Sequence, residues 1–336
     1  MDDIMLQVEN LITAFEMEGG LVRAVDEVSF TLGRGRNLGL VGESGCGKSV
    51  TALSIMRLLP RPAGRILGGR ILFKGQDIVA LPARDLHALR GNQIAMIFQE
   101  PMTALNPVHP IGRQVSEIFR LHFPGMTDDA VGQAAVKMLR KVGIPEPRRR
   151  MREYPHQISG GMRQRVMIAM ALACKPDILI ADEPTTALDV TIQAQILDLI
   201  RGLQAETGMS VMFITHDLGV IAELCDDVVV MYAGKVAERA PIRDLFRNPR
   251  HPYTRGLLTS IPTLDAPHKQ PLSVIRGVVP SPDALPEGCR FENRCPHAQP
   301  VCRTAQPPMV AVGPDHRSAC YFAGDLEPWK PPFKEG

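Results

Sequence analysis

Apolar and polar residues alternate in short stretches at the start of the chain. Residues 4–15 and 23–32 each alternate with a period near two, a glycine pair lies between them at 17–20, and an apolar run follows at 38–41. Such alternation is typical of half-buried strands, and the glycine pair is typical of a hairpin turn. The pattern predicts that the chain begins with an antiparallel β region.

Beyond residue 37 the pattern changes to apolar strands that alternate with amphipathic helices. Residues 37–56 combine a buried strand, a glycine-rich turn and a helix. The other predicted elements are strands at 95–99, 177–182, 210–215 and 227–240 and helices at 160–174, 189–207 and 218–225. Strands that alternate with helices form a mostly parallel sheet covered on both faces, so the predicted fold class is α/β.

Two regions depart from this alternation. Apolar positions at about 101–165 are spaced three and four apart without a good strand, which predicts an inserted helical subdomain. From residue 261 the composition shifts, with 14 of the 29 prolines in the last 76 residues. Proline excludes long helices and central strands. We expect one large domain at 1–260 and a small irregular module at 261–336. The small core of this module needs an additional stabilising element, such as a bound metal.

Composition restricts the class of protein. The 336 residues are 45% hydrophobic, and 38 basic against 36 acidic residues give a formal net charge of +2. This content can form a sizeable core, and the charge balance gives no overall field that would favour nucleic acid. The acidic N-terminus and the lack of an apolar run of about 18 residues argue against a signal peptide and a membrane span. We expect a cytoplasmic protein linked to a membrane only through another protein.

The strongest motif is GESGCGKS at residues 42–49, which matches the phosphate-loop pattern between a buried strand and a helix. Its glycines let backbone N–H groups turn toward phosphates, and the helix N-terminus adds positive potential. Lys48 is expected to pair with the β- and γ-phosphates, and Ser49 to ligate Mg²⁺. The predicted phosphate site comprises Gly42, Glu43, Ser44, Gly45, Cys46, Gly47, Lys48 and Ser49.

A second apolar strand, ILIAD at 178–182, ends in two acids. A carboxylate at the end of such a strand can hold the Mg²⁺ shell, which is the role expected of Asp182. Glu183 beside it can accept a proton from the water that attacks the γ-phosphate. Together with the phosphate loop, these acids indicate a nucleotidase.

The stretch ISGGMRQR at 158–165 narrows the class. It resembles the signature sequence of ATP-binding cassette proteins, usually Leu-Ser-Gly-Gly-Gln, from which Ile158 and Met162 depart. Ser159 with the N–H groups of Gly160 and Gly161 forms an anion site at a helix N-terminus whatever those two side chains are.

Further positions resemble cassette motifs. Gln99 matches the glutamine of the Q-loop, which lies near the metal and the attacking water. Asp189 ends TALD at 186–189 and resembles the acid of the dimer-contacting D-loop. His216 resembles the switch histidine that contacts the γ-phosphate, and Phe15 lies where the family places an adenine-stacking aromatic, although a core role is equally compatible with its hairpin. In this family two cassettes pack head to tail with ATP between them.

The sequences of longer segments indicate which kind of cassette protein this is. MIFQEPMTALNP at 97–108, the stretch from 154 to 197 and RHPYTRGLL at 250–258 closely resemble ATP-binding subunits of bacterial dipeptide and oligopeptide importers. The resemblance implies a second, homologous ATPase subunit, two permease subunits and an extracytoplasmic binding protein, with this chain on the cytoplasmic face of the membrane. Relatives that carry nickel or glutathione leave the substrate open. A non-transport cassette ATPase and a redox-sensing binding module are the rival hypotheses.

The seven cysteines fall into two groups. Cys46, Cys174 and Cys225 are scattered and are expected to act as small apolar residues. Cys289, Cys295, Cys302 and Cys320 are crowded into the tail, with a spacing that by itself selects neither zinc nor an iron–sulfur cluster. The importer resemblance implies a [4Fe–4S] cluster on these four, with zinc and free or transiently oxidised thiols as the alternatives. His297 and His316 are expected to be surface residues.

Overall fold

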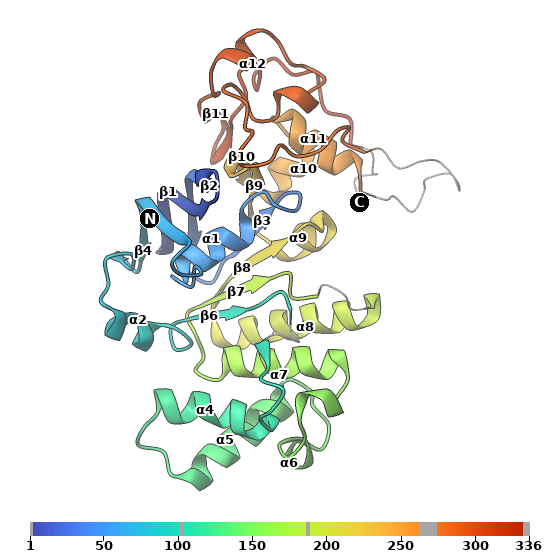
Figure 1. The fold of residues 1–336 in the computed structure, drawn as a ribbon. Helices are drawn as coiled ribbons and strands as arrows, with labels where there is room; N and C mark the ends of the chain where they lie inside the picture. The colour runs from blue at the N-terminus through green and yellow to red at the C-terminus, as the bar shows by residue number, and fades with distance from the viewer. Residues whose placement is uncertain (1–2, 101–103, 186–188, 262–273, 332–336) are drawn as a thin grey trace. The chain divides into compact units, whose positions relative to one another are not determined.

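The computed structural model describes residues 3–100, 104–185, 189–261 and 274–331, drawn as a ribbon in Figure 1. The chain divides into two compact units. The first comprises Met1–Met5, Gly33–Arg36 and Ala80–Met212, and the second comprises Leu6–Leu32, Asn37–Val79 and Phe213–Gly336. Each unit has strands and helices of its own.

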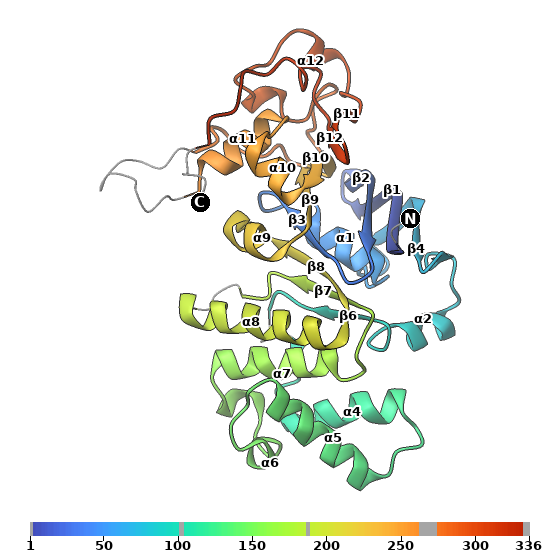
Figure 2. The same cartoon turned by 180° about the vertical axis from the view of Figure 1, so that it is seen from behind.

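Two parallel strands form the centre of the first unit, β6 (Ile94–Ile97) and β7 (Ile178–Asp182). Ile94 lies opposite Ile178, and Ile97 lies opposite Ala181. Every residue of both strands is buried, which explains why their sequences are continuous apolar runs and not alternating ones. Helices α7 (Gly160–Leu172) and α8 (Val190–Thr207) run side by side beside them in Figures 1 and 2.

Two of the remaining helices of the first unit, α4 (Ile111–His122) and α5 (Asp128–Lys141), are amphipathic. Ile111, Val115 and Phe119 recur every four residues on α4 and are buried, so one face of the helix packs inward. The hydroxyl of Thr127 accepts a hydrogen bond from the N–H of Ala130 and caps α5. The unit also contains α2 (Ala83–Leu89), α6 (Pro147–Arg150) and the 3₁₀ turn η1 (Pro155–Gln157).

The second unit contains the β region expected at the start of the chain. Its four strands have the order β2-β1-β4-β5, and β4 pairs antiparallel with both β1 and β5. The hairpin between β1 and β2 turns at the predicted glycine pair. The strands are β1 (Ile4–Met17), β2 (Gly20–Gly33), β4 (Gly64–Phe73) and β5 (Gln76–Asp77).

A second, mixed sheet in this unit has the order β11-β12-β10-β9-β3. Strand β3 pairs parallel with β9, and the other neighbours are antiparallel. Strand β8 (Ser210–Thr215) begins in the first unit and ends in the second. The strands are β3 (Asn37–Val41), β9 (Asp227–Tyr232), β10 (Lys235–Pro241), β11 (Val310–Gly313) and β12 (His316–Ser318), and the helices are α1 (Lys48–Ile55), α9 (Leu218–Leu224), α10 (Ile242–Arg247) and α11 (Pro252–Thr259).

The prediction of one strand over 227–240 was wrong, because the segment is a hairpin of β9 and β10. Its turn residues, Ala233 and Gly234, have φ angles of 44° and 84°. Positive φ at both central residues is characteristic of the tight turns that join twisted antiparallel strands. The chain therefore reverses in the middle of what reads as one apolar stretch.

The proline-rich tail consists of short pieces, in agreement with its composition. It contains a 3₁₀ turn, η2 (Glu292–Arg294), a single helical turn, α12 (Val301–Thr304), and the strands β11 and β12. Strand β12 pairs with β10, with Glu238 opposite Ser318. The tail thus extends the sheet of the second unit at its edge.

A buried carboxylate joins this added edge to the rest of the unit. Glu238 is 0% exposed, and it accepts hydrogen bonds from the N–H groups of Arg250 and His251 at 2.5 and 3.0 Å. Nε2 of His316 lies 2.7 Å from Oε1 of Glu238. The expectation that His316 is a surface residue was therefore wrong, since it is 4% exposed and paired with an acid 78 positions earlier.

Replacement of Glu238 by alanine should destabilise the second unit. The change leaves two backbone N–H groups and His316 without an acceptor, which costs about 3 kcal/mol and lowers the melting temperature by about 6 °C or more. Glu238→Gln keeps an acceptor oxygen and should lose less. Differential scanning fluorimetry of the full chain measures both, with Glu287→Ala on the exposed tail as the control. Equal melting temperatures for Glu238→Ala and Glu287→Ala would refute this role.

Candidate functional site

The predicted phosphate loop joins β3 to α1 in the second unit. Gly42, Gly45 and Gly47 have φ angles of 151°, 78° and 101°, which side-chain-bearing residues rarely adopt. A Cβ added at Gly42 would lie 2.2 Å from the carbonyl oxygen of Met231, and one added at Gly47 would lie 2.6 Å from that of Ala24. Close backbone approach therefore requires glycine at both ends of the loop.

Lys48 lies inside the loop and is 6% exposed. Its Nζ donates to the carbonyl oxygens of Gly42 at 2.7 Å and Glu43 at 3.1 Å. The ammonium group is thus held at the centre of the turn, where it can attract phosphate oxygens. Ser49 follows on the first turn of α1, and Ser44 and Gly45 are exposed at the rim.

The side chain of Cys46 is fully buried behind the loop, at 0% exposed. Burial raises the pKa of its thiol, so the sulfur is held neutral. A Cβ at Gly42 would also lie 2.7 Å from this sulfur. The side chain fills the space behind the loop, which agrees with the prediction that Cys46 acts as a small apolar residue.

Three residues that the sequence did not single out support the loop from behind. The N–H of Glu43 donates to the hydroxyl of Tyr253 at 2.8 Å, and the N–H of Gly234 donates to the carbonyl of Cys46 at 3.0 Å. The guanidinium of Arg294 binds the carboxylate of Glu43 through two hydrogen bonds of 2.6 and 2.9 Å. Tyr253 belongs to the RHPYTRGLL stretch, which is the one signal in the sequence that marks any of them.

The predicted acids lie at the end of β7 in the first unit. Asp182 is 3% exposed, and Glu183 follows it with a φ of 45°. Backbone strain of this kind is concentrated at functional sites. Nε2 of Gln99 donates to Oε2 of Glu183 at 2.8 Å, so two predicted site residues are in contact. Gln164 of α7 donates to the carbonyl of Pro184 at 2.5 Å and holds the turn that carries Glu183.

The signature residues also belong to the first unit. Ser159 caps α7 by accepting a hydrogen bond from the N–H of Met162 at 3.3 Å, and its exposed position leaves the helix N-terminus open to an anion. Nothing lies within 4 Å of a Cβ built at Gly160, while at Gly161 Ile192 is 3.3 Å away. Ile158, a departure from the signature, is 5% exposed and packs as an apolar residue.

Asp189, His216 and Phe15 have separate positions. Asp189 caps α8 through the N–H of Ile192 at 2.9 Å, and residues 186–188 of the predicted D-loop lie outside the described residues. His216 is exposed at the end of β8, in the second unit. Phe15 is half-buried on β1, opposite Gly64, and its ring would lie 3.0 Å from a Cβ at that glycine.

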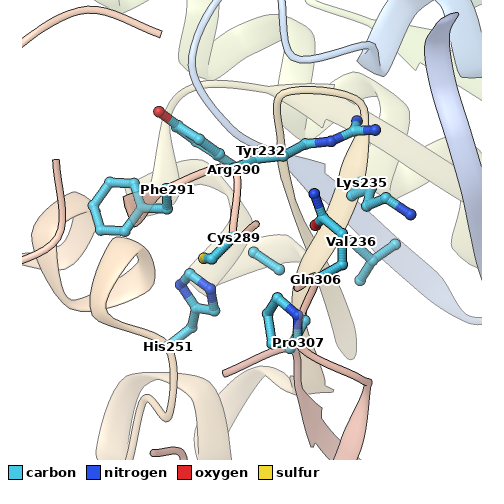
Figure 3. A pocket seen from close by; sticks show the side chains of 11 residues that line it. Tyr232, Lys235, Val236, His251, Cys289, Arg290, Phe291, Gln306 and Pro307 are labelled. Atoms are coloured by element: carbon cyan, nitrogen blue, oxygen red, sulfur yellow. The ribbon is translucent and has the colours of Figure 1, made fainter. Parts of the chain in front are cut away.

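The four tail cysteines line one pocket of the second unit, together with His251. The N–H of Cys289 donates to the carbonyl of Cys302 at 2.7 Å, and Figure 3 shows Cys289 beside His251 and Phe291. Burial raises the pKa of Cys295 and of Cys320 to about 11. Within the described residues, no group of three or more His, Cys, Asp or Glu side chains is arranged to hold a single metal ion, so no preformed zinc cage is present there.

Helices of membrane-spanning length and hydropathy are likewise absent from the described ranges.

Known proteins resemble this chain over nearly its full length. The ABC transporter family matches residues 25–186, and the oligopeptide/dipeptide transporter C-terminal region matches residues 237–302. A probable peptide ABC transporter ATP-binding protein of Sinorhizobium fredii is 52% identical over 96% of each chain. The dipeptide transport ATP-binding protein DppD of Bacillus subtilis is 50% identical over 95% of this chain and 94% of its own. The oligopeptide transport ATP-binding protein OppD of Salmonella typhimurium has the same identity and coverage.

Solved structures show the same cassette fold. A dimeric ATP-binding cassette in a post-hydrolysis state, bound to ADP and Pi, superposes with a TM-score of 0.64 and 27% sequence identity. The match covers 71% of this chain and 99% of that one. The predicted α/β cassette is confirmed at this level, with a sheet that is mixed where a mostly parallel one was expected. The chain belongs to the family of ABC transporter ATP-binding proteins.

Proposed function

We propose that this ABC ATPase powers the import of short peptides across the cytoplasmic membrane. The observation that carries the proposal is the similarity at about half identity over nearly the whole chain, C-terminal region included, to proteins named for dipeptide and oligopeptide transport. A cassette that shared only the ATPase core with these proteins would not match them through the tail.

The phosphate loop supplies the binding half of the reaction. Lys48 and the loop N–H groups hold the β- and γ-phosphates, and the buried position of Lys48 favours an anionic partner. Phe15 stacks on adenine, and His216 contacts the γ-phosphate. Ser49, Asp182 and Gln99 would hold Mg²⁺, which would supply positive charge to the phosphates.

Glu183 supplies the hydrolytic half as the general base that accepts a proton from the attacking water. Its contact with Gln99 at 2.8 Å supports this role, because a second polar group orients the carboxylate. The turn behind it is fixed by Gln164, so the carboxylate has a defined direction.

ATP is proposed to lie between two cassettes packed head to tail. Ser159, Gly160, Gly161 and Asp189 then contact the nucleotide bound by the partner, a second homologous ATPase subunit. The exposed N-terminus of α7 and the dimeric cassette of similar fold support this arrangement. The pair binds two permease subunits on the cytoplasmic face of the membrane, and an extracytoplasmic binding protein delivers the peptide.

The tail at 261–336 is proposed to be a distinct module that follows a nucleotide-binding domain at 1–260 and carries a [4Fe–4S] cluster. Cys289, Cys295, Cys302 and Cys320 would hold it, and their shared pocket supports the assignment. Four thiolates are the usual ligand set of such clusters.

Glu183→Gln should retain ATP binding and reduce hydrolysis by a factor of about 10²–10⁴. The amide keeps the shape of the side chain but cannot accept the proton from water. ATP affinity and steady-state hydrolysis of the assembled transporter measure the two effects separately. Glu206→Gln, at the exposed end of α8, is the control and should keep wild-type turnover. Near-normal hydrolysis by Glu183→Gln would remove Glu183 from its role.

ATP hydrolysis by the reconstituted transporter should increase when the binding protein is loaded with a short peptide. The series should compare dipeptides, tripeptides and longer peptides with nickel and with glutathione at equal concentrations. Stimulation by at least one peptide class, and a smaller response to nickel and glutathione, is the expected result. The substrate proposal fails if no peptide stimulates turnover.

Protein purified without air should contain about four iron and four sulfide per chain and absorb visible light. Cys302→Ser should lose this iron, because Cys302 is a proposed ligand. Cys174→Ser, on a cysteine of the other unit, should keep it. Zinc in place of iron, or iron content that is equal in the two variants, would overturn the cluster proposal.

A further inference from the structure

The cysteine-bearing segment, residues 289–302, contacts the phosphate loop through the side chain of Arg294. Arg294 directly precedes Cys295, and its guanidinium binds both carboxylate oxygens of Glu43, the second residue of the loop. The side chain of Arg294 is 4% exposed and that of Glu43 is 30% exposed. The two residues are 251 positions apart, and both belong to the second unit.

The contacts of Arg294 use its full hydrogen-bonding capacity. Nε donates to the carbonyl of Arg276 at 3.0 Å, and Nη2 donates to that of Ile275 at 3.2 Å as well as to Glu43. Nη1 donates to Glu43 and to the hydroxyl of Tyr232 at 3.3 Å. The guanidinium has five N–H groups, and five acceptors surround it. The site is therefore specific for arginine, because lysine carries three donors in a different geometry.

Hydrogen bonds hold both the backbone and the side chain of Glu43. Its N–H donates to the hydroxyl of Tyr253 at 2.8 Å, and its carbonyl accepts hydrogen bonds from Lys48 at 3.1 Å and from the N–H of Cys46 at 3.3 Å. The ion pair with Arg294 fixes the side chain. A shift of Glu43 would thus move the backbone of the loop and the acceptor of the lysine that binds phosphate.

Aromatic packing places Arg294 in this position. Phe291, three residues earlier, packs edge-on against Tyr232 at 5.2 Å and lies 5.4 Å from Tyr253. The guanidinium carbon of Arg294 lies 5.8 Å from the ring centre of Tyr232 and 6.0 Å from that of Phe291. Figure 3 shows Phe291 beside Tyr232 and above Cys289. The segment between Cys289 and Cys295 thus contributes two of the side chains that support the loop.

We propose that Arg294 is a positioning residue for ATP binding, which acts through Glu43 and makes nucleotide affinity depend on the conformation of the cysteine segment. The inference rests on the proposed role of the phosphate loop. It assigns Arg294 no contact with ATP. A loosened segment would weaken ATP binding while the hydrolytic groups, which belong to the other unit, keep their own contacts.

The test compares ATP affinity of the full-length chain in five forms: wild type, Arg294→Lys, Arg294→Gln, Glu43→Gln and the double variant Glu43→Gln/Arg294→Gln. Each single change should weaken ATP binding by about tenfold. Arg294→Lys keeps the charge but loses the two-point contact, so it should not restore affinity. If Arg294 acts through Glu43, the double variant should bind no more weakly than the weaker single variant.

A matched control separates positioning from general stability. Arg303→Gln removes a charge from the residue that follows Cys302, and Arg303 is 75% exposed with its nearest Glu292 oxygen at 3.5 Å. This variant should bind ATP as the wild type does. Melting temperatures of all forms show whether a loss of affinity follows a loss of fold. Wild-type affinity in both Arg294 variants, or losses that add in the double variant, would overturn the proposal.

Steady-state kinetics of the assembled transporter give a second measure. Arg294→Lys should raise the KM for ATP by about tenfold and leave kcat at saturating ATP within about twofold, since only the binding step depends on the loop. An equal fall in kcat at unchanged KM would contradict a positioning role. A wild type that fails to bind ATP, or a Lys48→Ala variant that binds it normally, would instead refute the proposed function of the loop.

Discussion

The architecture of the second unit depends on how closely the phosphate loop approaches its neighbours. Gly42 would place a Cβ 2.2 Å from the carbonyl of Met231, and Gly47 would place one 2.6 Å from the carbonyl of Ala24. Two strands, β9 and β2, therefore lie close against the loop, one at Gly42 and the other at Gly47. No side chain fits between the loop and these two strands. The carbonyls of Gly42 and Glu43 point toward Lys48, and its ammonium group stays inside the turn. The glycine-rich motif is a consequence of this packing as well as of phosphate chemistry.

The proline-rich tail attaches to this confined region mainly through charges and sheet pairing. Arg290 binds Asp26 and the carbonyl of Ala233, whose neighbour Gly234 donates to Cys46 in the loop. Glu238 accepts hydrogen bonds from two backbone groups and contacts His316, which joins β12 to β10. The tail was expected to need a stabilising element beyond its small core, and these buried polar contacts supply one from the protein itself. A cluster on the cysteines would add to this attachment.

Local patterns predicted the strands and helices around the phosphate loop and the acidic strand, because strand burial and helix amphipathicity depend on residues that are close in sequence. Strands β4 and β5 and helices α2, α10 and α11 were not predicted. The hairpin at 227–240 was missed because its turn, Ala233 and Gly234, lacks the Asn or Asp that usually marks such turns. The contacts of Glu238 with His316 and of Glu43 with Arg294 could not be predicted, since they join residues 78 and 251 positions apart. The sequence gives the types of these residues, but only the fold shows that they are paired.

The Glu43–Arg294 pair is energetically asymmetric. Loss of one partner from a buried ion pair costs about 3 kcal/mol or more, because the other charge remains out of water. Arg294 is 4% exposed and would keep an uncompensated charge if Glu43 were neutralised, whereas Glu43 is 30% exposed and can turn to solvent if Arg294 is removed. Neutralising Glu43 therefore destabilises the cysteine segment, whereas neutralising Arg294 mainly allows the phosphate loop to move. The Glu43–Arg294 pair couples the phosphate loop to the cysteine segment. The conformation of the segment then affects nucleotide affinity, and the loop affects the stability of the segment, because coupling between two sites is reciprocal.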